Sequence, residues 1–207
     1  MIAVVDFGAG NTRSVLRALE AIGADARLVT GAEGLDAGER VVLPGVGAAP
    51  SAVAELMRRG LWEPVRRWGR AGRPLLGLCL GAQLLLDGSD EGDAPGLGLI
   101  AGRCRAFPAP EDGGPRQVPH IGWNEVHTGE AAFDAYFVHG YWLDVEASAV
   151  AGWTEVDGFR FPSLLRAGAL TGTQFHPEKS GGTGRALLAA FASGALDAPR
   201  AEVAAWS

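Results

Sequence analysis

A cysteine placed between two glycines constrains the fold of this chain more than any other feature. Residues 77–81 read Gly-Leu-Cys-Leu-Gly, after an apolar run that begins at Pro74 and before a helix-like stretch over 80–86. The two glycines let the backbone bend sharply and let another molecule approach it closely. The pattern predicts a strand-to-helix nucleophile elbow with Cys79 at its tip. A sulfur at a helix N-terminus is favoured as the thiolate by unpaired N–H groups and the helix dipole.

A histidine far along the chain supplies the partner that such a cysteine needs. Residues 174–179 read Gln-Phe-His-Pro-Glu-Lys, which makes His176 the candidate base. Glu178 can lie on the same side of an extended segment and orient the imidazole. A cysteine more often packs as a small apolar side chain, and Cys104 is interpreted that way, as a strand residue. Cys79 differs because a plain core strand would avoid glycines on both sides, so the combined pattern favours catalysis.

Composition and charge narrow the class of protein. The chain has 207 residues with 47% hydrophobic and 20% charged side chains, which is typical of a soluble globular protein. The net charge of −6 and the lack of a basic stripe argue against a nucleic-acid partner. No apolar run approaches a membrane span, and no secretory signal precedes the first strand pattern. Two cysteines without a disulfide pattern suit a reducing, cytoplasmic location.

The order of the predicted elements indicates an α/β fold. Strand patterns over 2–7, 26–29, 41–43 and 74–78 alternate with helical patterns over 12–22 and from 48 through Trp68. This alternation predicts a mostly parallel central sheet flanked by helices. The loops at 8–10 and 44–47 and the Cys79 elbow should then gather at the carboxyl edge of that sheet.

The second half of the chain changes pattern. Loops are expected over 87–98 and 106–119, and a helix over 183–191. Between them lie short strand patterns without helices, which we interpret as added short antiparallel strands: 122–126, 136–138, 141–145, 149–154 and 161–165. A further run over 169–174 leads to His176. No repeat or long linker divides the chain, so we expect one domain over 1–207 that ends in a loose tail from about 199.

These motifs resemble those of the class I, triad-type glutamine amidotransferases, whose glutaminase domain carries a Cys-His-Glu triad. Residues 77–83 are similar to the nucleophile motif of that family, and residues 174–180 to its His-x-Glu motif. More narrowly, the chain resembles the glutaminase subunits of imidazole glycerol phosphate synthase, in histidine biosynthesis. That resemblance extends over residues 6–11, 43–47, 96–100, 118–124 and 136–139.

The resemblance implies hydrolysis of glutamine to glutamate and ammonia. Cys79 would attack the side-chain amide carbon and form a γ-glutamyl thioester, with His176 as acid and base and Glu178 fixing its tautomer. The tetrahedral oxygen needs two N–H donors. The residue after the nucleophile, Leu80, supplies one, and the second is expected from Val46 or Gly47. The glycines of the 44–47 loop permit a peptide flip, so this oxyanion hole could be conditional on other events.

Several further residues are candidates for substrate binding. Gln83 lies one helical turn beyond Cys79 and could bind the α-amino or α-carboxyl group of glutamine, although spacing alone also allows a solvent-facing side chain. The resemblance adds His139 and Gly140 to the substrate site. Gly140 departs from the Ser or Thr that the family usually has there, and Thr12 departs from a more usual apolar residue. These differences leave open a paralogue that serves a different synthase, such as a sugar- or cofactor-modifying one.

Other chemistries fit the pattern poorly. His120 and His139 lack an acidic residue two positions on, so by themselves they are interpreted as structural or interface residues, and His127 is expected to be exposed. The histidines and Cys79 lack the close spacing of a zinc site. The Gly-Ala-Gly at 8–10 is not followed by the third glycine of a dinucleotide loop, because position 13 is Arg. No cofactor is expected.

The resemblance also implies a partner. A cyclase subunit with a (β/α)₈ barrel would form a heterodimer with this chain, accept the ammonia and make imidazole glycerol phosphate and aminoimidazole carboxamide ribonucleotide. Asn11, Trp123, Asn124 and Lys179 belong to segments that the family uses at that interface. An ordinary surface lysine is the simpler interpretation of Lys179. A non-catalytic relative is a third possibility, which the intact cysteine, histidine and glutamate disfavour.

Overall fold

The computed structural model describes residues 1–8, 10–110, 117–129 and 131–197. The expected tail from about 199, Ala9 and residues 111–116 of the expected loop lie outside the described residues. None of the helices in the described part of the chain has the length and apolar character needed to cross a bilayer.

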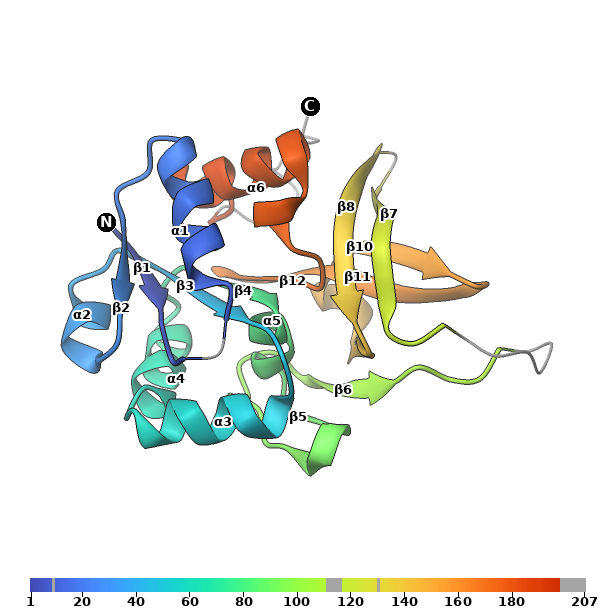
Figure 1. Cartoon of the computed structure of the whole chain (residues 1–207), viewed down its shortest axis with the longest axis horizontal. Helices are drawn as coiled ribbons and strands as arrows, with labels where there is room; N and C mark the ends of the chain where they lie inside the picture. Colours follow the sequence, from blue (N-terminus) through green and yellow to red (C-terminus); the bar gives the residue numbers. More distant parts are fainter. Residues whose placement is uncertain (9, 111–116, 130, 198–207) are drawn as a thin grey trace.

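A nine-stranded sheet in the order β2-β1-β3-β4-β12-β11-β10-β7-β8 forms the centre of the molecule (Figure 1). Its first part is parallel and consists of β2 (Ala26–Val29), β1 (Ile2–Val5), β3 (Arg40–Gly45), β4 (Leu75–Cys79) and β12 (Leu170–Thr173). Every residue of β1, β4 and β12 is buried, as expected for parallel strands with helices on both faces. The predicted parallel sheet is confirmed.

The other part of the sheet is antiparallel, as predicted. It contains β11 (Phe159–Ala167), β10 (Val150–Val156), β7 (His120–Thr128) and β8 (Ala131–His139). A separate three-stranded sheet pairs β5 (Gly88–Ser89), β6 (Gly102–Ala106) and β9 (Tyr141–Val145). Strands β7 and β8 are longer than predicted, because more exposed positions alternate with less exposed ones along them and interrupt the apolar pattern.

Helices cover both faces of the parallel strands (Figure 1). On one face lie α1 (Thr12–Ala21) and α6 (Gly181–Ser193), which share an apolar cluster with β1. On the other lie α2 (Ala32–Asp36), α3 (Ala49–Arg58), α4 (Trp62–Arg70) and α5 (Leu80–Leu84). Helix α2 was not predicted, because five residues with a central glycine are too short to display helical periodicity.

The region expected to be a loop over 87–98 contains β5 and a 3₁₀ turn, η1 (Glu91–Asp93). At the carboxyl edge of the sheet, Gly45 at the end of β3 is in register with Cys79 at the end of β4. The chain leaving β12 is fixed to β8, because the N–H of His176 donates to the carbonyl of Tyr136 at 2.9 Å. These connections bring the two sequence motifs together at one edge.

Candidate active site

The predicted elbow is present between β4 and α5. Cys79 has φ +51° and ψ −107°, a conformation that is uncommon for a residue with a side chain. A Cβ on Gly77 would lie 2.7 Å from the backbone nitrogen of Ala82, and a Cβ on Gly81 would overlap the carbonyl oxygen of Leu43. Only glycine at both positions lets α5 start this close to β3 and β4. The elbow therefore holds Cys79 at its tip in a strained conformation.

The sulfur of Cys79 has two polar neighbours. Its thiol lies 3.8 Å from the carbonyl oxygen of Val138, and the side-chain amide of Gln174 donates to the sulfur at 3.7 Å. Gln174 is fully buried, and its Oε1 accepts a hydrogen bond from Gln83 Nε2 at 3.2 Å. Sequence reasoning did not single out Gln174. Its position two residues before His176, on the same side of an extended segment, was the signal available.

His176 and Glu178 form a buried pair. Nδ1 of His176 lies 2.7 Å from Oε1 of Glu178, and the two side chains are only 2% and 1% exposed. A carboxylate only accepts, so Nδ1 carries the proton. The same carboxylate oxygen accepts from Asn11 Nδ2 at 3.4 Å. Ser180 fixes the segment, because its hydroxyl donates to the His176 carbonyl at 2.7 Å and accepts the N–H of Tyr136 at 3.0 Å.

The expectation that the backbone is extended from His176 to Glu178 is wrong. His176 is extended, but residues Pro177–Lys179 form a 3₁₀ turn, η3, with Pro177 at its start. The fixed φ of proline suits the first position of such a turn. The turn, and not the alternation of side chains along a strand, brings the Glu178 carboxylate to the His176 imidazole.

Electrostatics favour a charged imidazole beside Cys79. Burial lowers the pKa of His176, but the neighbouring Cys79 sulfur and Glu178 carboxylate outweigh this effect and raise that pKa to about 9. Within the described part of the chain, Nε2 of His176 is buried without a hydrogen-bond partner. A charged ring with one free N–H next to Cys79 can stabilise a thiolate and pass a proton to a bound molecule.

Replacing Glu178 with glutamine should lower the free energy of unfolding in a pH-dependent way. The raised pKa of His176, about 9 in the folded chain, stabilises the fold fully below the unfolded value near 6.5, and this stability is lost as pH rises through 9. Glu178→Gln should therefore cost about 1–2 kcal/mol at pH 6 and progressively less towards pH 9. Urea unfolding at several pH values measures this difference.

A matched control lies on β7, where His127 Nε2 and Glu125 Oε2 form a solvent-accessible pair at 3.6 Å, with side chains 32% and 62% exposed. Exposed pairs contribute little, so Glu125→Gln should change stability by less than about 1 kcal/mol at every pH. A loss that is as large at pH 9 as at pH 6 for Glu178→Gln would contradict the assignment of a charged His176.

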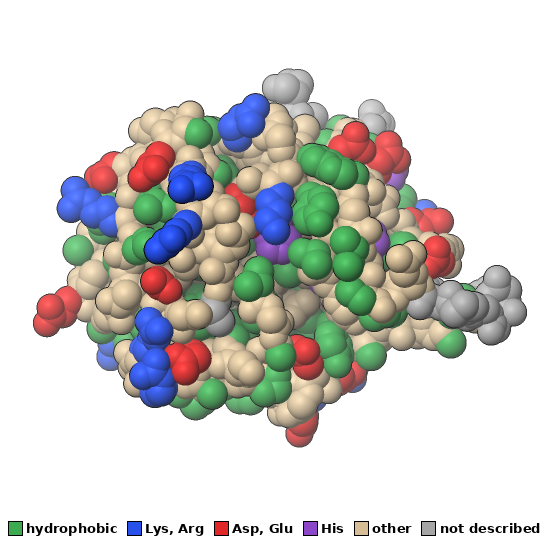
Figure 2. Space-filling view, in the orientation of Figure 1, with side chains coloured by type: hydrophobic (Ala, Val, Ile, Leu, Met, Phe, Trp, Pro, Cys, Tyr) green, Lys and Arg blue, Asp and Glu red, His purple; other side chains and the backbone are tan. Residues whose placement is uncertain are grey.

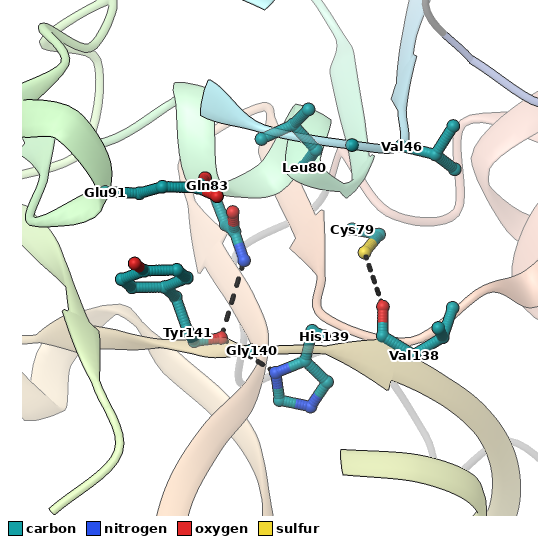
Figure 3. Close-up of a pocket in the computed structure, with 10 residues that line it drawn as sticks. Val46, Cys79, Leu80, Gln83, Glu91, Val138, His139, Gly140 and Tyr141 are labelled. Atoms are coloured by element: carbon teal, nitrogen blue, oxygen red, sulfur yellow. Dashed lines mark hydrogen bonds between the residues drawn. The ribbon is translucent and has the colours of Figure 1, made fainter. Parts of the chain in front are cut away.

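A cavity of ≈ 190 Å³ opens beside the sulfur (Figure 3). All three candidate donors of the oxyanion hole line it. Leu80 begins α5, while Val46 is 37% exposed and Gly47 has φ +92° in the segment that follows β3. The complete lining consists of Val46, Gly47, Cys79, Leu80, Gln83, Glu91, Val138, His139, Gly140 and Tyr141.

Gln83 is buried in the cavity wall, so the solvent-facing alternative is wrong. Its Nε2 donates to the Tyr141 carbonyl at 3.4 Å and to Gln174 Oε1 at 3.2 Å, which uses both amide hydrogens and leaves its Oε1 as an acceptor. Glu91 also lines the cavity, and its Oε2 accepts the N–H of Ala49 at 2.7 Å. Sequence reasoning missed Glu91, because nothing distinguishes it within an acidic loop.

His139 and Gly140 contribute to the cavity in different ways. The ring of His139 packs in a cluster of aromatic rings and lies on the other side of the backbone from Gln83 in Figure 3. A Cβ on Gly140 would meet only Val118, at 3.7 Å, so space does not exclude the Ser or Thr of the family. His127, which was expected to be exposed, is only partly exposed, with 32% of its side chain accessible. It lies within β7, and its ring stacks on Trp153 at 4.2 Å.

The expected interface residues share one surface only in part. Exposed apolar side chains on and before β7 are 49–58% accessible and lie over the β7–β8 hairpin, where Figure 2 shows them beside a basic side chain and a histidine. We define the β7–β8 face as Val118, Ile121, Trp123 and Tyr136. Lys179 is exposed beside it, with Nζ 5.5 Å from the Tyr136 ring. The amide of Asn124 instead turns towards β10 and donates to the Glu155 carbonyl at 2.9 Å.

No group of three metal-ligating side chains occurs within the ranges that the structure describes. At the end of the first strand, the N–H of Gly8 donates to Asp6 Oδ1 at 3.0 Å. A Cβ on Gly8 would also run into the guanidinium of Arg59.

The Cys79 sulfur, the His176 ring and the Glu178 carboxylate can together support nucleophilic catalysis, with Cys79 as the nucleophile and His176 and Glu178 as its proton-transfer pair.

Comparison with known proteins identifies the family of this chain. The family model for class-I glutamine amidotransferases matches residues 3–193. Solved structures with the same fold include a glutamine amidotransferase, with a TM-score of 0.74 and 22% identity over 93% of this chain and 98% of that one. Another is PurLQS from Thermotoga maritima, with a TM-score of 0.70 and 20% identity over 94% and 98% of the two chains. The fold and the family match define a class-I glutamine amidotransferase.

Similarity to individual proteins is higher. The imidazole glycerol phosphate synthase subunit HisH of Nitratidesulfovibrio vulgaris is 44% identical over 92% of this chain and 95% of its own length. The subunit of the same name from Gloeobacter violaceus is 41% identical over 99% of this chain and 94% of its own. Within the class-I glutamine amidotransferases, the chain therefore belongs to the HisH family.

Proposed function

We propose that this chain is the glutaminase subunit of an imidazole glycerol phosphate synthase, which hydrolyses glutamine and passes ammonia to a cyclase subunit in histidine biosynthesis. One observation carries the proposal. The sulfur of Cys79 lines a cavity of ≈ 190 Å³ next to a His176–Glu178 pair that is at most 2% exposed. Membership of the HisH family supports the histidine pathway over a paralogue with another acceptor.

The reaction follows from the two groups that the site leaves available, the Cys79 sulfur and Nε2 of His176. The sulfur of Cys79 attacks the side-chain amide carbon of glutamine, and the C–N bond breaks as Nε2 of His176 gives a proton to the departing ammonia. The product of this step is a γ-glutamyl thioester. Nε2 then takes a proton from water as the water oxygen bonds to the carbonyl carbon, and the C–S bond breaks, which releases glutamate and returns Cys79 to the thiolate. Glu178 holds the tautomer through its 2.7 Å hydrogen bond to Nδ1 and stabilises the imidazolium.

Backbone donors stabilise the tetrahedral oxygen. The N–H of Leu80 at the start of α5 is one donor, and the Val46–Gly47 segment supplies the second. Each donor of this kind contributes about 2.7–4 kcal/mol to lowering the barrier. The side-chain amide of Gln174 reaches the sulfur itself at 3.7 Å, where its N–H stabilises negative charge on Cys79.

Two acceptors in the cavity suit the α-ammonium group of glutamine. Glu91 brings the only carboxylate among the lining residues, and Gln83 faces the cavity with the Oε1 that its own hydrogen bonds leave free. Backbone groups of Gly140 and Tyr141 complete the wall. A single amino acid held at its α-carbon by these groups would place its side-chain amide at the sulfur.

The β7–β8 face is the proposed docking surface for the cyclase, which we expect to be a (β/α)₈ barrel in a heterodimer with this chain. Trp123 and Ile121 are 58% and 55% exposed, and exposed aromatic side chains are typical anchors of interfaces. The face continues into the site, because Ile121 pairs with Val138, whose carbonyl lies beside the Cys79 sulfur. We propose a cytoplasmic location, which two free buried cysteines suit.

Reconstitution tests the proposal. Purified chain and a purified cyclase subunit are mixed with glutamine and the phosphoribosyl aminoimidazole carboxamide nucleotide, and glutamate and imidazole glycerol phosphate are both measured. We expect equal amounts of the two products and co-elution of the two proteins. Glutamate release without imidazole formation would support the paralogue. No glutamate release with or without the cyclase would contradict the glutaminase assignment.

Lys179 offers a specific test of the docking surface, because it is the only lysine in the sequence. Lys179→Ala should weaken association or raise the ratio of glutamate to imidazole product, since loss of one charge from a desolvated interface pair costs several kcal/mol against about 0–1 for an exposed pair. Ammonia-dependent ring closure should not change. Amine-reactive labelling, which can modify only Lys179 and the N-terminus, should be slower at Lys179 in the complex.

The matched control is Arg185→Ala, which removes an exposed cation from α6. It should alter neither the product ratio nor the affinity. Equal behaviour of the two variants, with equal labelling of Lys179 in free and bound chain, would make Lys179 an ordinary surface residue.

A further inference from the structure

We propose that His120 and His139 form a hydrogen-bonded pair with fixed tautomers that positions the Tyr141 carbonyl in the glutamine cavity, which makes both of them positioning residues for glutamine binding. The inference rests on the proposed function. The two residues face each other across β7 and β8, and His139 ends β8 just before Tyr141.

A line of short contacts connects the pair to the cavity. Nδ1 of His120 lies 3.1 Å from Nε2 of His139, and Nδ1 of His139 lies 2.7 Å from the carbonyl oxygen of Tyr141. At the other end, Nδ2 of Asn124 lies 3.3 Å from Nε2 of His120. The line therefore runs from β7 through two buried rings to the wall of the cavity.

The direction of every hydrogen bond in this line follows from its ends. A carbonyl oxygen only accepts, so Nδ1 of His139 carries a proton and its Nε2 accepts when the ring is neutral. His120 must then donate from Nδ1, which leaves its Nε2 to accept from the amide of Asn124. Both rings are thereby fixed as the Nδ1–H tautomer.

The surroundings keep both rings neutral. Burial lowers the pKa of His139 to about 3, against the opposing effect of its Tyr141 hydrogen bond, and burial also lowers the pKa of His120. Aromatic rings enclose His139, with the centres of Phe107 and Phe161 at 5.5 and 5.4 Å. A proton on Nε2 of His139 would also point at the N–H of His120, so the geometry favours the neutral pair.

The Tyr141 carbonyl connects this pair to substrate binding. Figure 3 shows Gln83 and His139 approaching that oxygen from different sides, with distances of 3.4 and 2.7 Å. The shorter bond from His139 holds the carbonyl in place, and the carbonyl in turn orients the amide of Gln83. That orientation leaves Oε1 of Gln83 free for the α-ammonium of glutamine.

A purely structural role would be filled better by apolar side chains. Burying two rings with polar nitrogens costs hydration free energy that hydrogen bonds must offset. Leucine or phenylalanine side chains carry no such cost. The effect of the pair should therefore appear in glutamine binding and not only in stability. Because it acts on the end of the substrate remote from the reacting amide, it should change KM more than kcat.

Two substitutions at position 139 distinguish the role of Nδ1 from that of Nε2. Asparagine carries its amide nitrogen at the level of Nδ1 and can still donate to Tyr141. Glutamine carries it at the level of Nε2 and cannot. His139→Gln should raise KM for glutamine about tenfold, the order expected for one lost hydrogen bond, with kcat changed less than about threefold. His139→Asn should recover most of the wild-type KM.

A control substitution on the same hairpin is His127→Asn, since His127 stacks on Trp153 outside this line of contacts. It should leave KM unchanged. Equal KM values for His139→Gln and His139→Asn, or a loss confined to kcat, would overturn the inference.

Nitrogen-15 NMR of the histidine rings in the unmodified chain provides an independent readout. Both rings should show the neutral Nδ1–H pattern from pH 6 to pH 8. A neutral Nε2–H pattern or an imidazolium on His139 would overturn the inference even if glutamine is hydrolysed. Absence of glutaminase activity in the wild-type complex would instead contradict the proposed function, whatever the ring tautomers are.

Discussion

Cys79→Ala is expected to abolish glutamine hydrolysis and to leave ammonia-dependent ring closure by the complex unchanged. The sulfur is the only nucleophile proposed in the cavity, so its loss removes the covalent pathway. Loss of a catalytic nucleophile costs on the order of 10⁴–10⁶ in kcat. The fold should tolerate the change, because alanine fills less of the elbow and keeps the same backbone connection. Glutamate release with saturating glutamine measures the effect.

The second cysteine provides the matched control. Cys104 is buried in β6, where burial raises the pKa of its thiol, and it does not line the cavity. Cys104→Ala should keep glutaminase activity within about twofold and affect mainly stability. Glutamine hydrolysis by Cys79→Ala within tenfold of wild type would remove Cys79 from the mechanism, and loss of activity in both variants would point to unfolding instead.

The elbow and the parallel strands were predictable because their causes are local. Gly77 and Gly81 flank the cysteine, and the structure gives each a contact that no side chain would fit. Strands buried on both faces leave continuous apolar runs, and β4 is one of them. The order of strands and helices then indicated the edge at which Cys79 lies.

Other parts of the site depend on contacts between distant segments and left no local pattern. Glu91 reaches the cavity from a 3₁₀ turn in an acidic loop, where its neighbours are also acidic. Gln174 becomes important only because β12 pairs with β4 and brings its amide to the Cys79 sulfur. The partners of His120 and His139 likewise depend on the register of β7 and β8. Sequence periodicity contains none of these pairings.

The free chain is expected to hydrolyse glutamine slowly, and the cyclase with bound nucleotide should raise kcat about a hundredfold. A hundredfold gain corresponds to about 2.7 kcal/mol, which is the contribution of one oxyanion donor. The segment that would supply this donor is open to rearrangement. Gly45 is held in register with Cys79, but Val46 beyond it is 37% exposed, and a Cβ on Gly47 would meet nothing within 4 Å.

A partner on the β7–β8 face could stabilise the active arrangement of this segment, because Val46 and Val138 line the same cavity. Val46→Ala keeps the backbone N–H but removes the exposed side chain, so it should reduce the stimulation several-fold. Leu28→Ala serves as the control, since Leu28 is similarly exposed at 38% but lies on β2, at the opposite edge of the sheet from β8. The measurement is kcat for the free chain, the complex, and the complex with nucleotide. Full activity in the free chain would refute this coupling and leave the proposed chemistry intact.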